Sequence, residues 1–443
     1  MDDVKLISDL IWVKRGIAKR VPEKVKLKPE ELRRLLEGFN MLKLSQEPLK
    51  FRKIRGSNPE ENTEEGIEKY NLDEYDEETV EKTNPLSGIA VFSTPYEDAY
   101  ITEHINSDDE EREDFEIKPD DNLVVVAKIL KGDYTLEVYI YNENDDDWYV
   151  HHDYMLDVPP LCLETIRYDP GSDDKKGNLL AVGAMDSTIG IWDLDIVSAI
   201  SPIVSLKSAK SGKRYRRDGS AQVHSDAVLS LSWNSLTEHI LASGSADTTV
   251  ILWDIEEAKP ASVFSYGLGK VQSVEWHTAE ASILLSGTLS GNIMLSDCRE
   301  GKLCKKWSVN SDVERVLWDH FNPFYFFVAA NDGMLYYMDT RFDVEIYRRQ
   351  AHIGEVFGVS QSYQIKGLIS SCGADSKLNI WKLSQDGFNL VHSDMFDFGK
   401  LHTVRFSPDS ASILAVGGEK SDLVRIVLVN KYEPVNIAFG ANN

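Results

Sequence analysis

A unit of about 43 residues recurs between residues 179 and 428, and this period restricts the fold more than any other feature. Three copies place an aspartate six residues before a tryptophan; the pairs are Asp186 and Trp192, Asp247 and Trp253, and Asp375 and Trp381. Three weaker copies keep the spacing without the tryptophan; their pairs are Ser290 and Ser296, Asp332 and Met338, and Asp422 and Leu428. Successive units are separated by 61, 43, 42, 43 and 47 residues.

This spacing is typical of a β-propeller, in which one four-stranded blade takes about 40–45 residues. The gap of 61 residues predicts one blade plus an insertion, which we assign to residues 207–221. Three segments alternate apolar and polar residues as half-buried strands do. They are VLSLSW (228–233), VQSVEW (271–276) and VERVLW (313–318).

A seventh blade is expected from residues 87–150, although this stretch lacks the tryptophan. It contains four strand-like segments, IAVFS, NLVVVAKI, TLEVYIYN and WYVHH. Closing the sheets into a ring removes exposed sheet edges, and we expect a final strand near Val435–Phe439 to help seal the ring. The sequence therefore predicts an all-β protein, a seven-bladed propeller over residues 87–443.

The repeats resemble the WD40 family, in which a histidine, a serine or threonine, the turn aspartate and the tryptophan form a hydrogen-bonded relay. The residues His224, Ser243, Asp247 and Trp253 fit this pattern, as do His352, Asp375 and Trp381. In both copies the histidine lies 23 residues before the aspartate. We therefore interpret these histidine–aspartate pairs, and the Asp186 and Trp192 pair, as structural and not catalytic.

The net charge of −25 is unevenly distributed. Residues 1–55 hold 15 Lys and Arg against 8 Asp and Glu, whereas residues 56–121 hold 4 against 23. This contrast predicts a basic N-terminal arm over residues 1–55 and an acidic, disordered linker over residues 56–86, outside the propeller. The basic side chains beside Trp12 include Lys14, Arg15, Lys19 and Arg20.

A short helix is expected near residues 29–44 of the arm. Its apolar residues follow helical spacing on one face; they are Leu32, Leu35, Leu36 and Phe39. This stripe either packs on the propeller or docks another protein or a ribonucleoprotein.

Two charged segments leave several interpretations open. The acidic stretch 60–81 holds eleven carboxylates and one lysine, which suits a solvated linker or a surface that binds basic proteins. The insertion contains the segment KSAKSGKRYRR, with Lys210, Lys213, Arg214, Arg216 and Arg217. These side chains would contact RNA phosphates, act as a nuclear import signal, or only be solvated.

Sequence signals for enzyme chemistry are missing: the chain has no P-loop, no GxGxxG after a strand, no HExxH and no GxSxG. Its four cysteines include no CxxC pair, which indicates a reducing compartment. His151 and His152 are neighbours on an expected strand and should point to opposite faces, which argues against a shared metal ion. We expect a soluble, intracellular protein that is not an enzyme and binds no metal or cofactor.

Several stretches outside the repeat pattern resemble the periodic tryptophan protein family, the first of the two so named. They are IWVKRGIAKRVPEKVKLKPEEL, YNLDEYDEE, EREDFEIKPDDNLVVV, YVHHD and IWDLDIVSAISP, and they span most of the chain. The basic loop departs from the family in being shorter and less rich in lysine. The resemblance implies a nucleolar assembly factor for the large (60S) ribosomal subunit that supports maturation of 5.8S and large-subunit rRNA. Its partners would then be precursor rRNA and other assembly factors, with no membrane and no small-molecule substrate.

Our hypothesis for the arm is that it contacts the precursor particle through Trp12, Lys14, Arg15, Lys19 and Arg20. Two other functions remain open. The acidic stretch suits a histone-binding protein, and the resemblance implies that such a protein would act on chromatin in rDNA transcription. The motifs Asp297-Cys298-Arg299 and Asp339-Thr340-Arg341 match part of the adaptor-docking motif of cullin ubiquitin ligase receptors, without its tryptophan.

Overall fold

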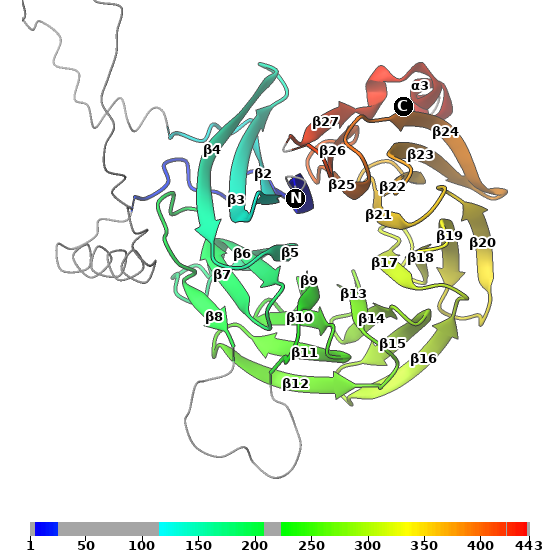
Figure 1. Ribbon diagram of the computed structural model, residues 1–443, viewed down its shortest axis with the longest axis horizontal. Coiled ribbons are helices and arrows are strands. Elements are labelled where there is room, and N and C mark those ends of the chain that lie inside the picture. Colours follow the sequence, from blue (N-terminus) through cyan, green and yellow to red (C-terminus); the bar gives the residue numbers. More distant parts are fainter. Residues whose placement is uncertain (1–4, 25–114, 208–222, 422, 441–443) are drawn as a thin grey trace, which may run out of the picture. The chain divides into compact units, whose positions relative to one another are not determined.

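Seven antiparallel sheets follow one another along the chain in the computed structural model (Figure 1), which describes residues 5–24, 115–207, 223–421 and 423–440. Six sheets have four strands and the last has three. The innermost strands of neighbouring sheets lie side by side around the whole ring, including the last sheet against the first. The predicted seven-bladed propeller is therefore confirmed, and each sheet is one blade.

The first four blades are formed by strands between Lys5 and Ser308. Blade 1 contains β1 (Lys5–Val13), β2 (Asp121–Leu130), β3 (Asp133–Asn142) and β4 (Asp147–Leu156). Blade 2 contains β5 (Pro160–Tyr168), β6 (Lys176–Ala184), β7 (Ile189–Asp193) and β8 (Val204–Leu206). Blade 3 contains β9 (Val228–Trp233), β10 (Ile240–Ser245), β11 (Thr249–Asp254) and β12 (Lys259–Ser265). Blade 4 contains β13 (Val271–Trp276), β14 (Ile283–Thr288), β15 (Asn292–Asp297) and β16 (Lys302–Ser308).

The other three blades complete the ring. Blade 5 contains β17 (Val313–Trp318), β18 (Tyr325–Ala330), β19 (Met334–Asp339) and β20 (Glu345–Gln350). Blade 6 contains β21 (Val356–Gln361), β22 (Leu368–Gly373), β23 (Lys377–Ser384) and β24 (Gly387–Met395). Blade 7 contains β25 (Leu401–Phe406), β26 (Ile413–Gly418) and β27 (Arg425–Leu428), followed by η4 (Val429–Lys431) and α3 (Glu433–Phe439).

The hydrophobic core is divided among the interfaces between blades. Alternation along each strand sends side chains to both faces of a sheet, so one blade packs against two neighbours. The cluster between blades 2 and 3, for example, joins Ile191 and Leu206 to Val228 and Trp253. Trp253, Trp318 and Trp381 are among the largest fully buried side chains. Because each blade buries its faces only against others, the closed ring is the stable unit.

Blade 1 corrects the expected boundary of the arm. Its innermost strand is β1, which pairs antiparallel with β2 from Lys5 opposite Leu130 to Val13 opposite Leu123. Residues 5–13 therefore belong to the propeller, although the charge pattern places residues 1–55 in a basic arm. Three of the four segments expected for this blade are present as β2, β3 and β4. The segment IAVFS lies outside the described residues.

The C-terminus gives a second correction. The strand expected near Val435–Phe439 is instead α3, which packs on β24 of blade 6. Pro434 occupies the first turn of this helix, where its missing N–H costs nothing. The Tyr432 ring stacks on His392 at 3.9 Å, and its hydroxyl donates to Asp394 at 2.7 Å. These contacts direct the chain end toward blade 6.

The ring is closed by contacts of β1 with the last blade and with blade 2. Asp9 accepts the Thr403 hydroxyl of blade 7 at 3.0 Å and the Leu163 N–H of blade 2 at 3.0 Å. Trp12 donates its indole N–H to the Arg405 carbonyl at 3.0 Å. Residues from opposite ends of the chain therefore meet in one hydrogen-bonded junction.

Three expectations fall outside the described residues. They are the helix at 29–44 with Leu32, Leu35, Leu36 and Phe39, the acidic linker at 56–86, and the part of the basic insertion from 208 to 221. The insertion position agrees with the sequence, because it separates β8 of blade 2 from β9 of blade 3.

Candidate functional site

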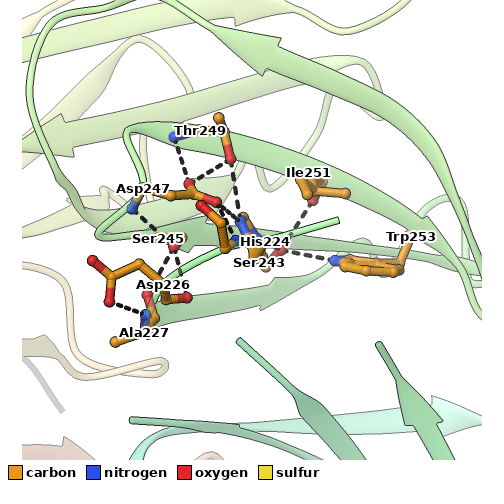
Figure 2. Close-up of polar contacts among 10 residues, drawn as sticks. His224, Asp226, Ala227, Ser243, Ser245, Asp247, Thr249, Ile251 and Trp253 are labelled. Atoms are coloured by element: carbon orange, nitrogen blue, oxygen red, sulfur yellow. Dashed lines mark hydrogen bonds and ion pairs between the residues drawn. The ribbon is translucent and has the colours of Figure 1, made fainter. Parts of the chain in front are cut away.

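The hydrogen-bonded relay expected in blade 3 is present (Figure 2). Trp253 donates its indole N–H to the Ser243 hydroxyl oxygen at 2.8 Å, and His224 Nε2 lies 2.7 Å from the same oxygen. His224 Nδ1 lies 3.1 Å from an Asp247 carboxylate oxygen. A carboxylate only accepts, so Nδ1 carries the proton and Nε2 accepts the Ser243 hydroxyl. The relay joins the inter-blade loop, two strands and the turn between them.

Asp247 is held as an ionised acceptor by its surroundings. Burial alone would raise its pKa, but the hydrogen bonds from His224, the Thr249 hydroxyl and the Ser225 N–H outweigh burial and lower the pKa. The carboxylate also accepts the Thr249 N–H, which fixes the turn before β11. The Asp247 carboxylate therefore accepts hydrogen bonds from residues that form blade 3 itself, as Figure 2 shows.

Blade 6 repeats this geometry. His352 Nδ1 lies 2.8 Å from Asp375, His352 Nε2 lies 2.8 Å from Ser371, and Trp381 donates to Ser371 at 2.9 Å. Burial lowers the pKa of His352. The sequence interpretation had not included Ser371. The signal was present, since Ser371 precedes Asp375 by four residues as Ser243 precedes Asp247.

Blade 2 has the aspartate and tryptophan but a different local network. The Asp186 carboxylate accepts the Thr188 N–H at 3.0 Å and so caps its turn. The position that corresponds to the relay serine is Val182, and Leu163, 23 residues before Asp186, lies inside β5 opposite Val182 and not in the loop before the strand. Trp192 packs against the Tyr154 ring of blade 1 at 5.2 Å. Asp186 and Trp192 therefore contribute to the structure of blade 2 without forming a hydrogen-bonded relay.

A second set of hydrogen bonds links the innermost strands around the central channel, and the sequence interpretation did not find it. In it, a side-chain oxygen of one blade accepts a backbone N–H of the next. The pairs are Glu164 with Trp233, Ser230 with Val274, Ser232 with Trp276, Ser273 with Val316, and Ser360 with Phe406. The acceptors are four serines and Glu164 on otherwise largely apolar strands, and only the ring geometry identifies what they bind.

Charged side chains gather in the central channel, where the innermost strands of several blades line a cavity of about 500 Å³. Burial raises the pKa of Glu164 to about 7 and that of Glu275 to about 8, against the lowering effect of Arg315 and Arg405. The Arg405 guanidinium lies 4.0 Å from Asp9. These groups belong to strands of blades 1, 2, 4, 5 and 7, so the channel contributes to holding the ring together.

The candidate particle contacts of the N-terminal segment divide into buried and exposed residues. Trp12 is 5% exposed and bonded to blade 7, so it is not available for the expected contact with the precursor particle. Arg15 is half-buried, and its backbone N–H donates to Asp409 at 2.8 Å. Lys14 is exposed at the end of β1.

Lys19 and Arg20 are exposed and paired with carboxylates. Lys19 Nζ lies 2.9 Å from Glu23, and Arg20 Nε lies 2.5 Å from Glu116. Exposed pairs of this kind contribute about 0–1 kcal/mol, so both cations can exchange partners. Lys210, Lys213, Arg214, Arg216 and Arg217 lie outside the described residues.

The two adjacent histidines contradict the expectation that they point to opposite faces. Their Nδ1 atoms lie 2.6 Å apart, and both side chains are buried. The pairing of β3 with β4 shifts between Val138 and Tyr139, where Val138 faces His152 and Tyr139 faces Val150. His151 is thus the extra residue of a β-bulge, which turns two successive side chains to one side.

The histidine pair continues into a buried chain of hydrogen bonds. His151 Nε2 contacts the Phe115 carbonyl at 3.1 Å, and His152 Nε2 contacts the Tyr154 hydroxyl at 2.8 Å. Burial lowers the pKa of His152 to about 3 and also lowers that of His151. These hydrogen bonds fasten the Phe115 carbonyl to β4 of blade 1.

Three other expectations concern a metal site, a membrane-spanning segment and the two adaptor-like motifs. Among the described residues, no group of three or more His, Cys, Asp or Glu side chains is placed to hold a metal ion. In the same part of the chain, no helix has the length and apolar character needed to cross a bilayer. In the two adaptor-like motifs, Arg299 lies 2.7 Å from Asp297 and Arg341 lies 2.7 Å from Asp339.

Comparison with known proteins identifies the family. The model of the WD domain, G-beta repeat, matches residues 219–254, which contain the blade 3 relay. The chain is 35% identical to "Periodic tryptophan protein 1 homolog" of Drosophila melanogaster, over 99% of this chain and 97% of that protein. The chain belongs to the periodic tryptophan protein 1 family. A member from Saccharomyces cerevisiae, "Periodic tryptophan protein 1", is 28% identical over 93% of this chain and 86% of its own length.

Two further similarities agree with this assignment. An uncharacterized WD repeat-containing protein of Schizosaccharomyces pombe is 36% identical over 96% of this chain and 89% of its own length. A chain in the crystal structure of a mitotic checkpoint complex matches with a TM-score of 0.54 at 17% identity, covering 69% of this chain and 83% of that chain. The last similarity supports the propeller fold alone. The similarity to the periodic tryptophan protein 1 homolog covers 99% of this chain, so it includes segments both inside and outside the repeats.

Proposed function

We propose that this protein is a non-catalytic scaffold in the assembly of the large ribosomal subunit. It would act in the nucleolus, within early precursor particles, and support processing of 5.8S and large-subunit rRNA. The observation that carries the proposal is the similarity to the periodic tryptophan protein 1 family over nearly the full length of both chains. That similarity covers 99% of this chain, far beyond the single repeat, residues 219–254, that the WD-domain model matches.

The environment of the histidine–aspartate pairs supports a scaffold. In blades 3 and 6 each imidazole is bonded on both nitrogens by a serine and a carboxylate of its own blade. A general base needs a free nitrogen within reach of a substrate proton. These histidines are committed to the framework, where a satisfied buried network rigidifies a fold.

The exposed cations after β1 support contact with an RNA-containing particle. Lys14, Lys19 and Arg20 lie on a segment fixed at both ends: Arg15 N–H bonds to Asp409, and Lys19 N–H bonds to Asp195 at 3.0 Å. Phosphate groups would replace the weak carboxylate pairs of Lys19 and Arg20. Because counterions are released, such binding would weaken as salt increases.

The structure changes how the role of the N-terminal segment must be tested. A deletion of residues 1–45 would remove β1 and open the ring, so loss of function would be uninformative. The charge-reversal variant Lys14→Glu/Lys19→Glu/Arg20→Glu leaves β1 intact. Its matched control is Lys259→Glu/Lys302→Glu/Lys306→Glu on the exposed strands β12 and β16.

The experiment is affinity purification of each tagged full-length chain from cells, followed by RNA and protein identification and gradient sedimentation. We expect the wild type and the control to co-sediment with large-subunit precursors, and the triple variant to lose a salt-dependent part of that association. Depletion of the protein should cause precursors of 5.8S and large-subunit rRNA to accumulate. Normal processing after depletion, with no precursor RNA in the purified wild type, would refute the proposed function.

A further inference from the structure

Blade 7 is one strand short of the other blades. Its sheet has the order β25-β26-β27, whereas the other six sheets have four strands each. The chain after β27 does not add the fourth strand, because η4 and α3 turn to blade 6 and fasten there through Tyr432 and its contacts with His392 and Asp394. The short strand β27 is therefore the outer edge of blade 7 among the described residues (Figure 1).

The fourth strands of the other blades have a common role. Each places a large, mainly apolar side chain in the hydrophobic cluster between its own blade and a neighbour. These side chains are Tyr154 on β4, Leu206 on β8, Phe264 on β12, Trp307 on β16, Tyr347 on β20 and Phe388 on β24. Blade 7 has no counterpart in the described residues.

The interface between blades 7 and 1 is correspondingly less covered at its outer end. Ile426 and Leu428 of β27 and Trp148 of blade 1 pack against the same buried cluster between blades 7 and 1, and all three remain partly exposed. Trp148 is stacked on Tyr139 with ring centroids 4.5 Å apart, so it presents a fixed aromatic surface. Leu423, just before β27, is 62% exposed.

The backbone and charge of β27 define what fits beside it. In an antiparallel strand, alternate residues direct their N–H and C=O groups away from the paired strand. Within the described chain, the backbone groups of residues 425–428 bond only to β26. Arg425 is exposed, and no carboxylate of the described residues forms an ion pair with it.

We propose that the outer edge of β27 docks an extended segment of a partner protein, which adds as the fourth strand of blade 7. The segment alternates apolar and acidic residues. One large apolar side chain covers Trp148, Ile426 and Leu428, and a carboxylate pairs with Arg425. Strand addition supplies affinity through main-chain hydrogen bonds, and the alternate side chains supply selectivity. A nucleic acid strand offers no such backbone ladder, so the observations favour a protein segment.

A defined probe can test this edge in the full-length chain. The probe is a fluorescein-labelled synthetic peptide that alternates valine and glutamate around one central tryptophan. The control peptide has the same composition with its valines and glutamates in separate blocks. Binding is followed by fluorescence anisotropy, and the site is located by amide hydrogen exchange across residues 423–428. Because no ribosomal component is present, the result is independent of the proposed ribosomal function.

We expect the alternating peptide to bind and to slow exchange in β27 by about tenfold or more. The blocked peptide should bind less tightly and give no protection there. Arg425→Glu should weaken binding of the alternating peptide by about fivefold. Arg349→Glu, on the exposed strand β20 of a complete blade, should leave binding unchanged.

Four results would overturn the proposal. They are equal binding of the two peptides, protection located outside β27, protection already complete in the chain alone, and protection that rises with chain concentration alone. The third would indicate that another segment of this chain fills the edge. The fourth would indicate a second copy of the chain.

Discussion

Blade 3 and blade 1 hold their strands together with buried hydrogen bonds, but they collect the participating residues differently. Blade 3 is formed by residues 228–265, and its relay joins His224 to Trp253 within one stretch of chain. Blade 1 joins residues 5–13 to residues 121–156, and Asp9 bonds to residues 154 and 394 positions away. The local network leaves a regular sequence signature, whereas the distant one leaves almost none.

The difference also concerns what each network stabilises. The blade 3 relay fastens strands and a turn that already belong to one sheet. Asp9 instead fastens blade 1 to both neighbours, so it stabilises the closure of the ring. We therefore expect the two networks to differ in energetic importance, and four predictions test this comparison in order of decreasing effect.

Asp9→Ala should be the most destabilising change. Asp9 is 4% exposed and accepts hydrogen bonds from Leu10 N–H, Leu163 N–H and the Thr403 hydroxyl. Alanine would leave these donors without an acceptor beside the Arg405 guanidinium. The free energy of unfolding in urea should fall by about 3–5 kcal/mol. Asp153→Ala, exposed on β4 of the same blade, should change it by less than about 0.5 kcal/mol.

A small loss for Asp9→Ala, below about 1 kcal/mol, would mean that apolar packing alone closes the ring. The comparison between local and distant networks would then fail.

Ser243→Ala and Ser371→Ala should each cost about 2–3 kcal/mol. Each change removes the oxygen that accepts a buried tryptophan N–H and contacts a histidine nitrogen. The two losses should be similar, because the relay geometry is the same in blades 3 and 6. Chemical denaturation of both variants checks this. Ser265→Ala, at an exposed position of β12, is the control and should be nearly neutral. Unequal losses would show that position in the ring modifies the relay.

The blade 1 histidine chain should make stability depend on pH. Burial lowers the pKa of His152 from 6.5 in the unfolded chain to about 3 in the folded protein. The unfolded state therefore binds more protons between these values, and stability falls as pH decreases from 6.5 toward 3. The slope from this group is at most about 1.4 kcal/mol per pH unit. His152→Gln should reduce this dependence, as measured by unfolding at a series of pH values.

The channel provides a control of opposite sign. The pKa of Glu275 rises from 4.5 to about 8 on folding, so the folded state binds more protons between these values. Its contribution to stability is present at low pH and is lost as pH rises toward 8. Glu275→Gln should therefore remove this loss between about pH 4.5 and 8, and leave the fall in stability below about pH 4.5 unchanged. Flattening of the acidic side by Glu275→Gln would contradict these assignments.

Lys19→Ala should have the smallest effect, a loss of about 0.5 kcal/mol or less. The Lys19 and Glu23 side chains are 54% and 67% exposed, so solvent screens their ion pair. The hydrogen bond that positions this segment uses the Lys19 backbone N–H and survives the substitution. Thermal unfolding checks the prediction, with Lys14→Ala as the control. A loss comparable to that of Ser243→Ala would show that the exposed pair helps close the ring.

Much of the fold followed from local patterns. The segments VLSLSW, VQSVEW and VERVLW are the strands β9, β13 and β17 with unchanged bounds, because strict alternation marks half-buried strands. The relay residues of blades 3 and 6 were also predictable from spacing. Ser371 was overlooked although its spacing matched. The family resemblance and the comparison agree over nearly the whole chain.

The errors arose where residues far apart in sequence determine the structure. Trp12 looked like part of a basic arm because its neighbours are charged, but β1 is buried by pairing with β2, over a hundred residues away. The histidines of blade 1 share a side because of a bulge set by pairing with β3. The C-terminal segment forms a helix because blade 6 offers it a packing surface.

The sequence by itself determined the number of blades, the place of most strands and the relay, because each depends on residues within one repeat. Only the tertiary structure decided which strand begins the ring, what Asp9 binds, and that β27 is the last strand of blade 7 among the described residues. These features depend on contacts between distant segments, whose free energy appears only when the ring closes. For the same reason, the edge of β27 could not have been found from the sequence.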